Sequence, residues 1–279
     1  MIMNTLTTSP FLQQRNGADT CVITNGIPKS GTYFINKIVA YLGHWENSRV
    51  HIIPGEYYTV PPEGDFIYIQ CPEHHTVQRL LNGQFMAAHL PWTQKLEDVM
   101  RESTPTRCIK HILLYRDPRD MLVSYTRFVT NSPTYRRTAV ARARQNFMRS
   151  NFSTDKERLT YIIQERLDNY STKYDYLQYE SWLRSPQCCA IRFESLYKEF
   201  RELPRNGLGD VLNRLLAYLN VDVNSIDPID FHRNVFGKSL TASGEENKIG
   251  QYTRYFEAHH YEMLKQSNYP KAIENFGYS

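Results

Sequence analysis

The chain has 279 residues, which is long enough for one large hydrophobic core, and we expect a single domain. Its hydrophobic fraction of 41% and charged fraction of 22% are typical of a globular protein. The sequence contains no run near the ~18 apolar residues of a membrane span, and residues 1–16 lack the charged and apolar segments of a signal peptide. Five cysteines, an odd number without metal-ligand spacing, favour free thiols in a reducing compartment, so we expect a cytoplasmic protein.

The net charge of +4 is unevenly distributed along the sequence. No acidic residue lies between Asp120 and Asp155, and six arginines fall inside this gap: Arg127, Arg136, Arg137, Arg142, Arg144 and Arg149. The basic stretch Arg127–Arg149 could attract a nucleotide, an acidic acceptor or an anionic membrane surface, or it could be a solvated helical face. A nucleic-acid partner is not expected, because no nucleic-acid-binding motif accompanies the charge.

The predicted elements alternate between short apolar strands and amphipathic helices. Residues 1–18 are expected to form a flexible segment. Strands are predicted at Cys21–Thr24, Phe66–Ile69, Ile112–Tyr115 and Cys189–Phe193, and helices over Phe34–Leu42, from Pro118 onward, over Glu157–Leu183 and near Val211–Leu219. Asp117 is the expected N-cap of the helix at Pro118, with Asp120 completing a capping-box-like start. The pattern predicts one α/β domain with a central, mostly parallel sheet flanked by helices.

A short loop, Pro28–Phe34, follows the first predicted strand and has the sequence PKSGTYF. Ligands of open α/β sheets bind where a strand ends and the next helix begins. Gly31 lets the backbone approach closely, the amides and dipole of the helix start attract an anion, and Lys29 adds a full positive charge. The lysine precedes the glycine instead of following it, so the loop is not the ATP-binding Walker loop. The loop therefore predicts a P-loop-like cradle for a phosphate or phosphosulfate, with an ordinary turn as the alternative.

Several segments, in the same order, resemble motifs of the cytosolic-type sulfotransferase family that uses 3′-phosphoadenosine-5′-phosphosulfate (PAPS). They are Pro28–Phe34, His89–Pro91, Tyr115–Tyr125, Ile191–Leu196 and, more weakly, Lys248–Phe256. The resemblance extends over about residues 21–257 and implies a sulfotransferase domain at 19–279. It implies transfer of a sulfuryl group from PAPS to a hydroxyl by in-line displacement, without a metal.

The resemblance assigns His89 as the general base, and an imidazole with an ordinary pKa near about 6.5 suits removal of a hydroxyl proton. Lys29 would stabilise the leaving bridging oxygen together with the amides of the loop. For His89, a structural position is the alternative. The residues expected to bind PAPS are Lys29, Ser30, Gly31, Thr32, Tyr33, Phe34, Arg116, Ser124, Phe193 and Lys248.

The resemblance implies that Arg116 and Ser124 hold the 3′-phosphate, and a planar guanidinium is able to bind phosphate through two hydrogen bonds. Phe193 would stack on the adenine. For Arg116 the alternative is an ion pair with a neighbouring carboxylate such as Asp120, and for Phe193 it is a position in the core.

The sequence departs from the family pattern at two places. Ala87 stands where the family often has a lysine two residues before the histidine, so either Lys29 carries that charge alone or another basic residue reaches in. Glu245–Asn247 stands where Arg-Lys-Gly is common. In the family this basic segment is a second contact to the 3′-phosphate. Lys248 is the first candidate to replace it here, and Lys238 and Arg254 are the alternatives.

Two other functions remain open: a nucleotide-dependent small-molecule kinase and a non-catalytic PAP-binding protein, PAP being adenosine 3′,5′-bisphosphate. The missing Gly-Lys-Ser/Thr disfavours the kinase, and the presence of both Lys29 and His89 disfavours the binding protein. The acceptor class is also open. Aromatic candidates for its pocket suit a partly apolar alcohol, whereas the arginines suit an anionic sugar or glycolipid. These candidates are Tyr57, Tyr58, Phe85, Phe128 and Tyr135. The pairs His74–His75 and His259–His260 lack metal-ligand spacing, so no metal site is expected.

Overall fold

The central sheet is fully parallel in the part of the chain that the computed structural model describes, which is residues 20–52, 67–69, 80–102, 108–132, 135, 139–168, 176–236 and 249–279. Its six strands have the order β3-β2-β4-β1-β5-β6. They are β1 (Thr20–Gly26), β2 (Glu46–Ile52), β3 (Ile67–Ile69), β4 (Gln84–Ala88), β5 (Cys108–Tyr115) and β6 (Cys188–Arg192). The predicted α/β class is thereby confirmed. The segment at 1–18 that we expect to be flexible lies outside the described residues.

Central strand β1 is buried on both faces, as expected for a parallel sheet covered by helices. Its residues Cys21, Val22 and Ile23 are fully buried, and their side chains alternate between two hydrophobic cores. Strands β2 and β4 were not predicted from the sequence. In β2 the sequence ENSRVHI lacks an apolar run, and the strand exists because β4 and β3 pair with it on either side.

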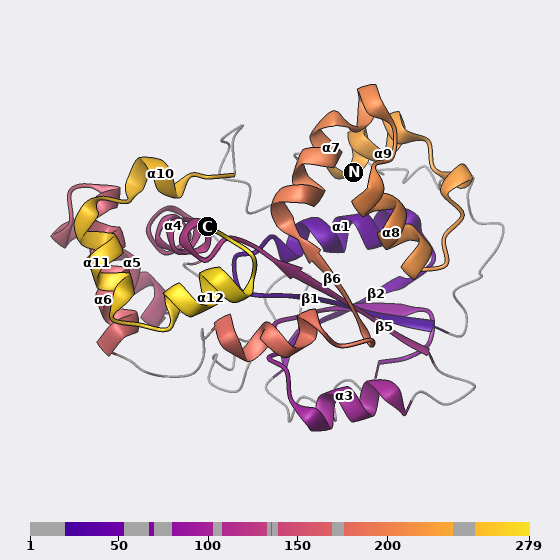
Figure 1. Cartoon of the computed structure of the whole chain (residues 1–279), viewed down its shortest axis with the longest axis horizontal. Helices are drawn as coiled ribbons and strands as arrows, with labels where there is room; N and C mark the ends of the chain where they lie inside the picture. Colours follow the sequence, from indigo (N-terminus) through magenta and orange to yellow (C-terminus); the bar gives the residue numbers. More distant parts are fainter. Residues whose placement is uncertain are drawn as a thin grey trace, which may run out of the picture.

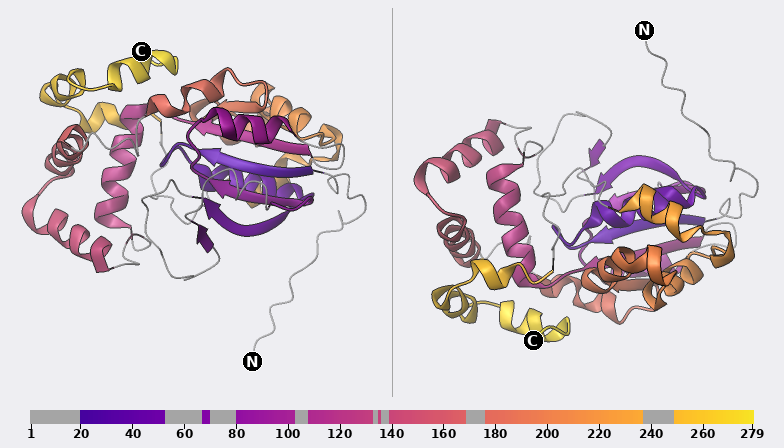
Figure 2. Two further views of the ribbon diagram at one scale, coloured as in Figure 1. Left: turned by 90° about the horizontal axis from the view of Figure 1, so that it is seen from below. Right: turned by 90° about the horizontal axis from the view of Figure 1, so that it is seen from above.

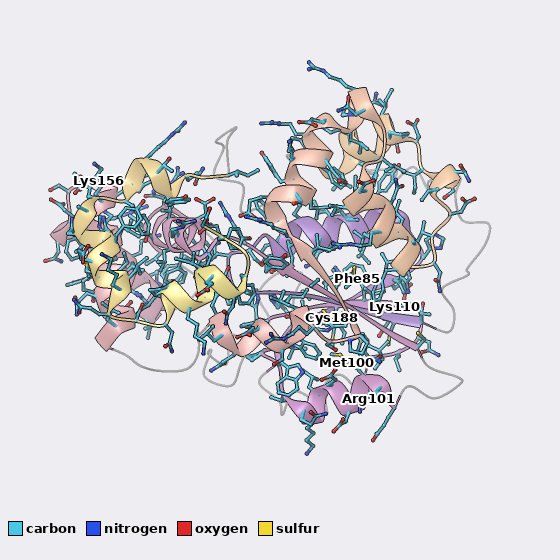
Figure 3. All side chains as sticks on the ribbon, in the orientation of Figure 1. Phe85, Met100, Arg101, Lys110, Lys156 and Cys188 are labelled. Carbon is cyan, nitrogen blue, oxygen red and sulfur yellow. The ribbon has the colours of Figure 1, made fainter. Side chains whose placement is uncertain are left out.

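One face of the sheet is covered by helices that pack on the core around Phe85, Ile112 and Ile191 (Figure 1). These helices are α1 (Thr32–Leu42), α7 (Phe193–Asn206), α8 (Asp210–Tyr218) and α9 (Pro228–Val235), with the short 3₁₀ helix η4 (Val223–Ser225) after α8. Phe85 was expected in the acceptor pocket, and this prediction is wrong. Its ring is buried on the sheet within this core (Figure 3), because alternate residues of β4 face the helices.

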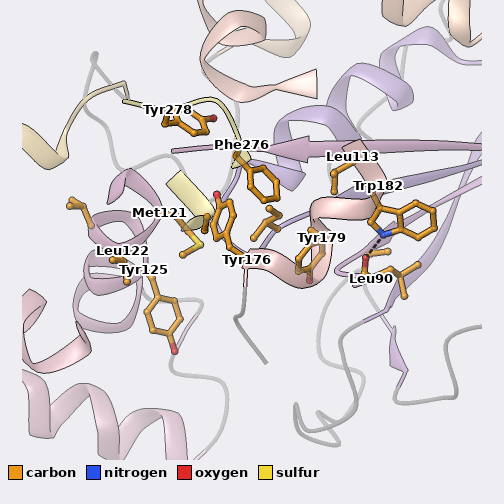
Figure 4. Packing of buried hydrophobic residues seen from close by; sticks show 14 of the residues in the cluster. Leu90, Leu113, Met121, Leu122, Tyr125, Tyr176, Tyr179, Trp182, Phe276 and Tyr278 are labelled. Atoms are coloured by element: carbon orange, nitrogen blue, oxygen red, sulfur yellow. Dashed lines mark hydrogen bonds between the residues drawn. The ribbon is translucent and has the colours of Figure 1, made fainter. Parts of the chain in front are cut away.

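The opposite face is covered by α3 (Gln94–Arg101) and a 3₁₀ helix, η3 (Tyr176–Leu183). Helix α3 buries Met100 against the sheet and exposes Arg101 (Figure 3). In η3 the indole N–H of Trp182 donates to the carbonyl of Leu90 at 3.0 Å (Figure 4). The amphipathic segment predicted over Glu157–Leu183 is therefore two elements, because the aromatic residues of its second part pack on the sheet.

The remaining helices gather at one end of the sheet (Figures 1 and 2). They are α4 (Pro118–Asn131), α5 (Ala139–Asn151), α6 (Asp155–Asp168), α10 (Tyr252–Tyr255), α11 (Ala258–Lys265) and α12 (Tyr269–Asn275). Residues 169–175, between α6 and η3, lie outside the described part. No helix within the described ranges combines the length and apolarity that crossing a membrane requires.

His111 on β5 is a polar residue enclosed in the core. Its ring meets that of Trp182 at a centroid distance of 4.3 Å, and neither ring nitrogen has a hydrogen-bond partner among the described residues. Burial lowers the pKa of His111 to about 3, so the ring is neutral when folded. The unfolded chain, with an ordinary histidine pKa of about 6.5, binds more protons below that pH, and stability therefore falls as the pH drops toward 3.

We expect His111→Leu to raise the free energy of unfolding at pH 7 by about 1–2 kcal/mol, because it removes a buried polar group without a partner. The gain over the wild type should grow by about 1.4 kcal/mol per pH unit below pH ~6.5. Urea denaturation at pH 7 and pH 5 measures the gain in the free energy of unfolding and its dependence on pH. At pH 7, His111→Asn, which keeps a buried polar group, should not stabilise; equal effects of the two variants at this pH would contradict the explanation.

Candidate active site

The predicted site residues meet along the carboxyl edge of the sheet, where each follows the end of a strand. His89 follows β4, the Pro28–Phe34 loop follows β1, Arg116 follows β5 and Phe193 follows β6. These strands are adjacent in the order β4-β1-β5-β6, so the residues lie in that order along the edge. This edge is where parallel α/β sheets bind ligands.

The Pro28–Phe34 loop is fixed to the neighbouring strand β5. The hydroxyl of Ser30 and the amide of Ile27 both donate to the carbonyl of Leu114, at 2.7 and 3.2 Å. Lys29 and Gly31 adopt left-handed backbone conformations, with φ of 73° and 102°. At Gly31 a Cβ atom would lie 2.8 Å from the ring of Phe193, so only glycine fits this turn without displacing that ring. The backbone therefore approaches the sheet edge closely.

The loop also presents hydrogen-bond donors at the start of α1. Thr32 begins α1, and its buried hydroxyl has no hydrogen-bond partner in the described part of the chain. No side chain caps the helix at Gly31. At Gly26 a Cβ atom would lie 2.4 Å from the Thr32 hydroxyl oxygen, so glycine keeps this corner open. Helix amides, a hydroxyl and the helix dipole together suit an anionic group such as a phosphosulfate.

Lys29 supplies the positive charge of the loop. Its Nζ lies 3.8 Å from the ring centroid of Phe128 on α4, a cation–π contact. Burial, followed by the charge of Arg116, lowers the pKa of Lys29 to about 7. An anion bound in the loop would stabilise the ammonium form and raise this pKa.

Anion binding should therefore weaken as the pH rises above 7, because the bound state holds a proton on Lys29 that the free protein has lost. We expect the affinity for PAP to fall by at least about tenfold between pH 7 and 9, at no more than about tenfold per pH unit. Calorimetry across this range measures the slope. In the control Lys29→Arg the guanidinium stays charged, so its affinity should stay nearly constant. A wild-type slope as flat as that of the arginine variant would contradict the lowered pKa.

His89 is held by a hydrogen bond between its Nδ1 and the carbonyl oxygen of Gly26 at 2.5 Å. A carbonyl oxygen only accepts, so Nδ1 carries the hydrogen and Nε2 of the neutral ring is the proton acceptor. Burial and the charge of Lys29 lower the pKa of His89 to about 4, against the opposing effect of the Gly26 hydrogen bond. The half-buried ring is therefore neutral at pH 7.

Asn25 fixes the backbone that carries His89. Its side chain donates to the carbonyl of Leu90 at 2.9 Å and accepts from the amide of Leu90 at 2.8 Å. These two bonds continue the pairing of β1 with β4 beyond the last paired residues. This role of Asn25 was not predicted from the sequence, although an asparagine at a predicted strand end is a signal for it.

Arg116 is buried and pairs with Asp120, whose carboxylate lies 3.5 Å from the guanidinium. This is the contact named as the alternative to phosphate binding. The guanidinium also lies 4.9 Å from the ring centroid of Phe193. A guanidinium has five N–H donors, so the ion pair with Asp120 does not by itself exclude a contact with a phosphate.

Asp120 does not close a capping box, contrary to the sequence prediction. Its two oxygens accept from the amides of Gly250 and Tyr252, at 2.8 and 2.9 Å. Asp117 caps α4 as predicted, and its own amide donates to Glu194 at 3.0 Å. Asp120 therefore links α4 to the segment that contains α10, a long-range contact without a local sequence signal.

The other predicted PAPS contacts differ in how deeply they are buried. Phe34 is in the core, edge-to-face with Phe200 at 5.0 Å, and its amide donates to Gly31. Phe193 opens α7 instead of ending β6, and its buried ring stacks on Tyr197 at 5.4 Å. Adenine stacking by Phe193 thus stays a prediction. Ser124 and Tyr33 are half-buried, on α4 and α1.

Several predicted residues lie outside the described part of the chain: Lys248, Lys238, Tyr57 and Tyr58. Phe128 and Tyr135 are in edge-to-face contact at 5.3 Å beside Lys29. His259 and His260 lie on α11 near the hydroxyl of Thr160, at 3.0 and 2.7 Å. Within the described ranges no cluster of His, Cys, Asp and Glu could hold a metal.

Comparisons with known proteins identify the family and the fold of the chain. A family model for the sulfotransferase domain matches residues 19–203. Among solved structures, the chain is similar to mouse sulfotransferase SULT7A1 complexed with PAP, with a TM-score of 0.51 and 14% sequence identity over 93% of this chain and 89% of that chain. At this identity the structural likeness establishes the fold. No curated protein matches the chain.

Proposed function

The chain belongs to the PAPS-dependent sulfotransferase family, and we propose that it moves the sulfuryl group of PAPS onto a hydroxyl of its acceptor, with His89 as the general base. The observation that carries this proposal is the bond between His89 Nδ1 and Gly26 O at 2.5 Å. It ties the base to the strand end from which the Lys29 loop begins. Base and cation are thus side by side at the edge of the sheet.

Each residue has a separate task in this proposal. PAPS supplies the activated sulfuryl group. The loop amides and the Thr32 hydroxyl bind the phosphosulfate oxygens, and the Lys29 ammonium neutralises the charge that develops on the leaving oxygen. His89 Nε2 takes the proton of the acceptor hydroxyl. Arg116 and Ser124 bind the 3′-phosphate.

Isothermal calorimetry with PAP, AMP and ATP tests the donor site. Micromolar or tighter binding of PAP without magnesium, and much weaker binding of AMP, would support the proposal. A magnesium-dependent preference for ATP would instead support the kinase. If PAP binds but no acceptor is sulfated, the non-catalytic alternative holds.

We expect Arg116→Gln to weaken PAP binding by about 10- to 100-fold, the effect of losing hydrogen bonds to a charged group, and to leave AMP binding nearly unchanged. Arg119→Gln is the matched control. Its guanidinium is held by Asp117 at 2.7 Å, so the preference for PAP over AMP should persist. Equal losses for PAP and AMP in Arg116→Gln would argue against a 3′-phosphate contact.

Two further expectations belong to this proposal: a cytoplasmic location, and contact of the Arg127–Arg149 stretch with an anionic acceptor or membrane surface. Within this stretch α5 contains no acidic residue and exposes two apolar side chains, Val140 and Phe147, as well as the basic Arg142 and Arg149. An apolar and basic surface suits amphiphilic anions. Sedimentation with anionic vesicles but not with neutral ones would support the membrane contact, and no sedimentation with either would refute it.

A further inference from the structure

A second histidine lies next to the proposed base. His51 is near the carboxyl end of β2, the strand that pairs with β4 on the side away from β1. Its ring centroid is 4.8 Å from that of His89, with the planes tilted by 49°. It also meets Tyr33, on the first turn of α1, edge-to-face at 6.4 Å. His51 thus lies between the base and the helix that follows the Lys29 loop.

The strand register explains how His51 reaches this place. His51 is directly opposite Ala87 in the β2–β4 pair, so the two side chains lie on the same face of the sheet. His89 follows two residues after Ala87 and continues that face. The small side chain of Ala87 leaves room for an imidazole from the neighbouring strand, and His51 is 4% exposed there.

The order of the strands indicates which bound group would lie nearest to His51. Arg116 and Phe193, the proposed contacts of the nucleotide, follow β5 and β6, on one side of the loop after β1. With the nucleotide on that side, a phosphosulfate bound by the loop would direct its sulfur toward β4 and β2. His51 is on this side, where the acceptor must approach.

We propose that His51 is a second catalytic imidazole, which donates an N–H hydrogen bond to the sulfuryl group as it passes to the acceptor. This role rests on the proposed sulfotransferase function. In the transfer, the bond between sulfur and the bridging oxygen breaks and a bond from sulfur to the acceptor oxygen forms. The acceptor proton goes to His89 Nε2, and the electron pair of the broken bond stays on the phosphate of PAP, beside Lys29. His51 keeps its proton throughout.

The surroundings of His51 favour a neutral donor. Burial and the nearby His89 keep the pKa of His51 well below its usual range, so the ring carries one N–H hydrogen at neutral pH. Ala87 has no polar group to serve in its place. A preorganised donor in a site that excludes water stabilises developing negative charge without reorganisation.

The test compares a variant that keeps the ring shape with one that keeps a donor. His51→Phe retains a flat ring without an N–H, and His51→Gln retains an N–H donor without the ring. Turnover is measured as PAP release from PAPS with a panel of phenols, alcohols and sugars, and PAP affinity is measured by calorimetry. The control His44→Phe replaces a half-buried histidine that contacts Trp45 instead, at 5.6 Å.

We expect His51→Phe to lower turnover by about 10- to 100-fold, up to the loss seen when one oxyanion donor is removed. PAP affinity should stay within about twofold, His51→Gln should retain more turnover than His51→Phe, and His44→Phe should match the wild type. Placing an ammonium donor in the same space with Ala87→Lys should recover part of the loss in His51→Phe. If His51→Phe is as active as the wild type, or more active than His51→Gln, the donor role is wrong while the sulfotransferase function stands. A wild-type protein that binds PAP but sulfates no acceptor overturns both.

Discussion

Replacing His89 with asparagine should lower the turnover number by about 10²- to 10⁴-fold, the usual contribution of a general base. The side-chain amide of asparagine can still donate to the carbonyl of Gly26, which His89 contacts at 2.5 Å in the wild type. The loop after β1 should therefore keep its shape. Only the proton acceptor Nε2 is lost.

The affinity for PAP distinguishes loss of the base from loss of the site. Calorimetry should give a dissociation constant for PAP within about threefold of the wild type, because PAP is the product of the donor and does not contain the acceptor hydroxyl that His89 would deprotonate. An unchanged turnover number would exclude His89 as the base. A parallel loss of PAP binding would instead show that His89 supports the loop.

The pH dependence of turnover gives an independent check on the same residue. Since burial and Lys29 lower the pKa of His89 to about 4, the ring of the free protein is already deprotonated at pH 6. The acid side of the profile for kcat/KM should thus fall only as the pH approaches 4. A decline near the ordinary histidine pKa of about 6.5 would show that the site does not hold His89 in this environment.

The site residues that the sequence predicted belong to local motifs at strand ends. The loop around Lys29, His89 and Arg116 could be found because a strand, a turn and a helix start are each encoded over a few neighbouring residues. Their placement side by side follows from the parallel α/β pattern. The family model confirms that residues 19–203 form a sulfotransferase domain, while the roles of the individual site residues stay predictions.

The contacts that link these motifs could not be predicted, because they join residues far apart in the chain. Asn25 holds Leu90, 65 residues away, and Asp120 holds Gly250, 130 residues away. His51 lies beside His89 only because β2, a strand with a polar sequence, pairs with β4. Such contacts depend on tertiary pairing, which overrides local propensity.

The contacts of Asp120 are an example of a long-range interaction that should contribute strongly to the stability of the fold. Its carboxylate is fully buried, lies 3.5 Å from Arg116 and accepts from the amides of Gly250 and Tyr252 at 2.8 and 2.9 Å. Burial raises the pKa of Asp120, while Arg116 and the two amides oppose this shift. Removing the carboxylate would leave a buried guanidinium and two amides without their acceptor.

We therefore expect Asp120→Ala to lower the free energy of unfolding by about 3–5 kcal/mol, the cost of breaking a buried ion pair by removing one partner. Asp120→Asn keeps one acceptor oxygen, so its free energy of unfolding should fall by less than that of Asp120→Ala. Asp98→Ala is the control, since its pair with Arg101 at 3.4 Å is exposed and should contribute less than about 1 kcal/mol. Urea denaturation measures all three.

The same variants connect this ion pair to nucleotide binding. If the 3′-phosphate binds Arg116, PAP supplies negative charge to the guanidinium that Asp120→Ala leaves uncompensated. PAP should then raise the melting temperature of Asp120→Ala by more than it raises that of the wild type, whereas AMP should raise both equally. An equal increase of the melting temperature by PAP in both proteins would show that the Asp120–Arg116 pair is not coupled to nucleotide binding.

The stability prediction has its own contrary outcome. If Asp120→Ala lowers the free energy of unfolding by less than about 1 kcal/mol, other groups hold Arg116 and the Gly250–Tyr252 segment in place.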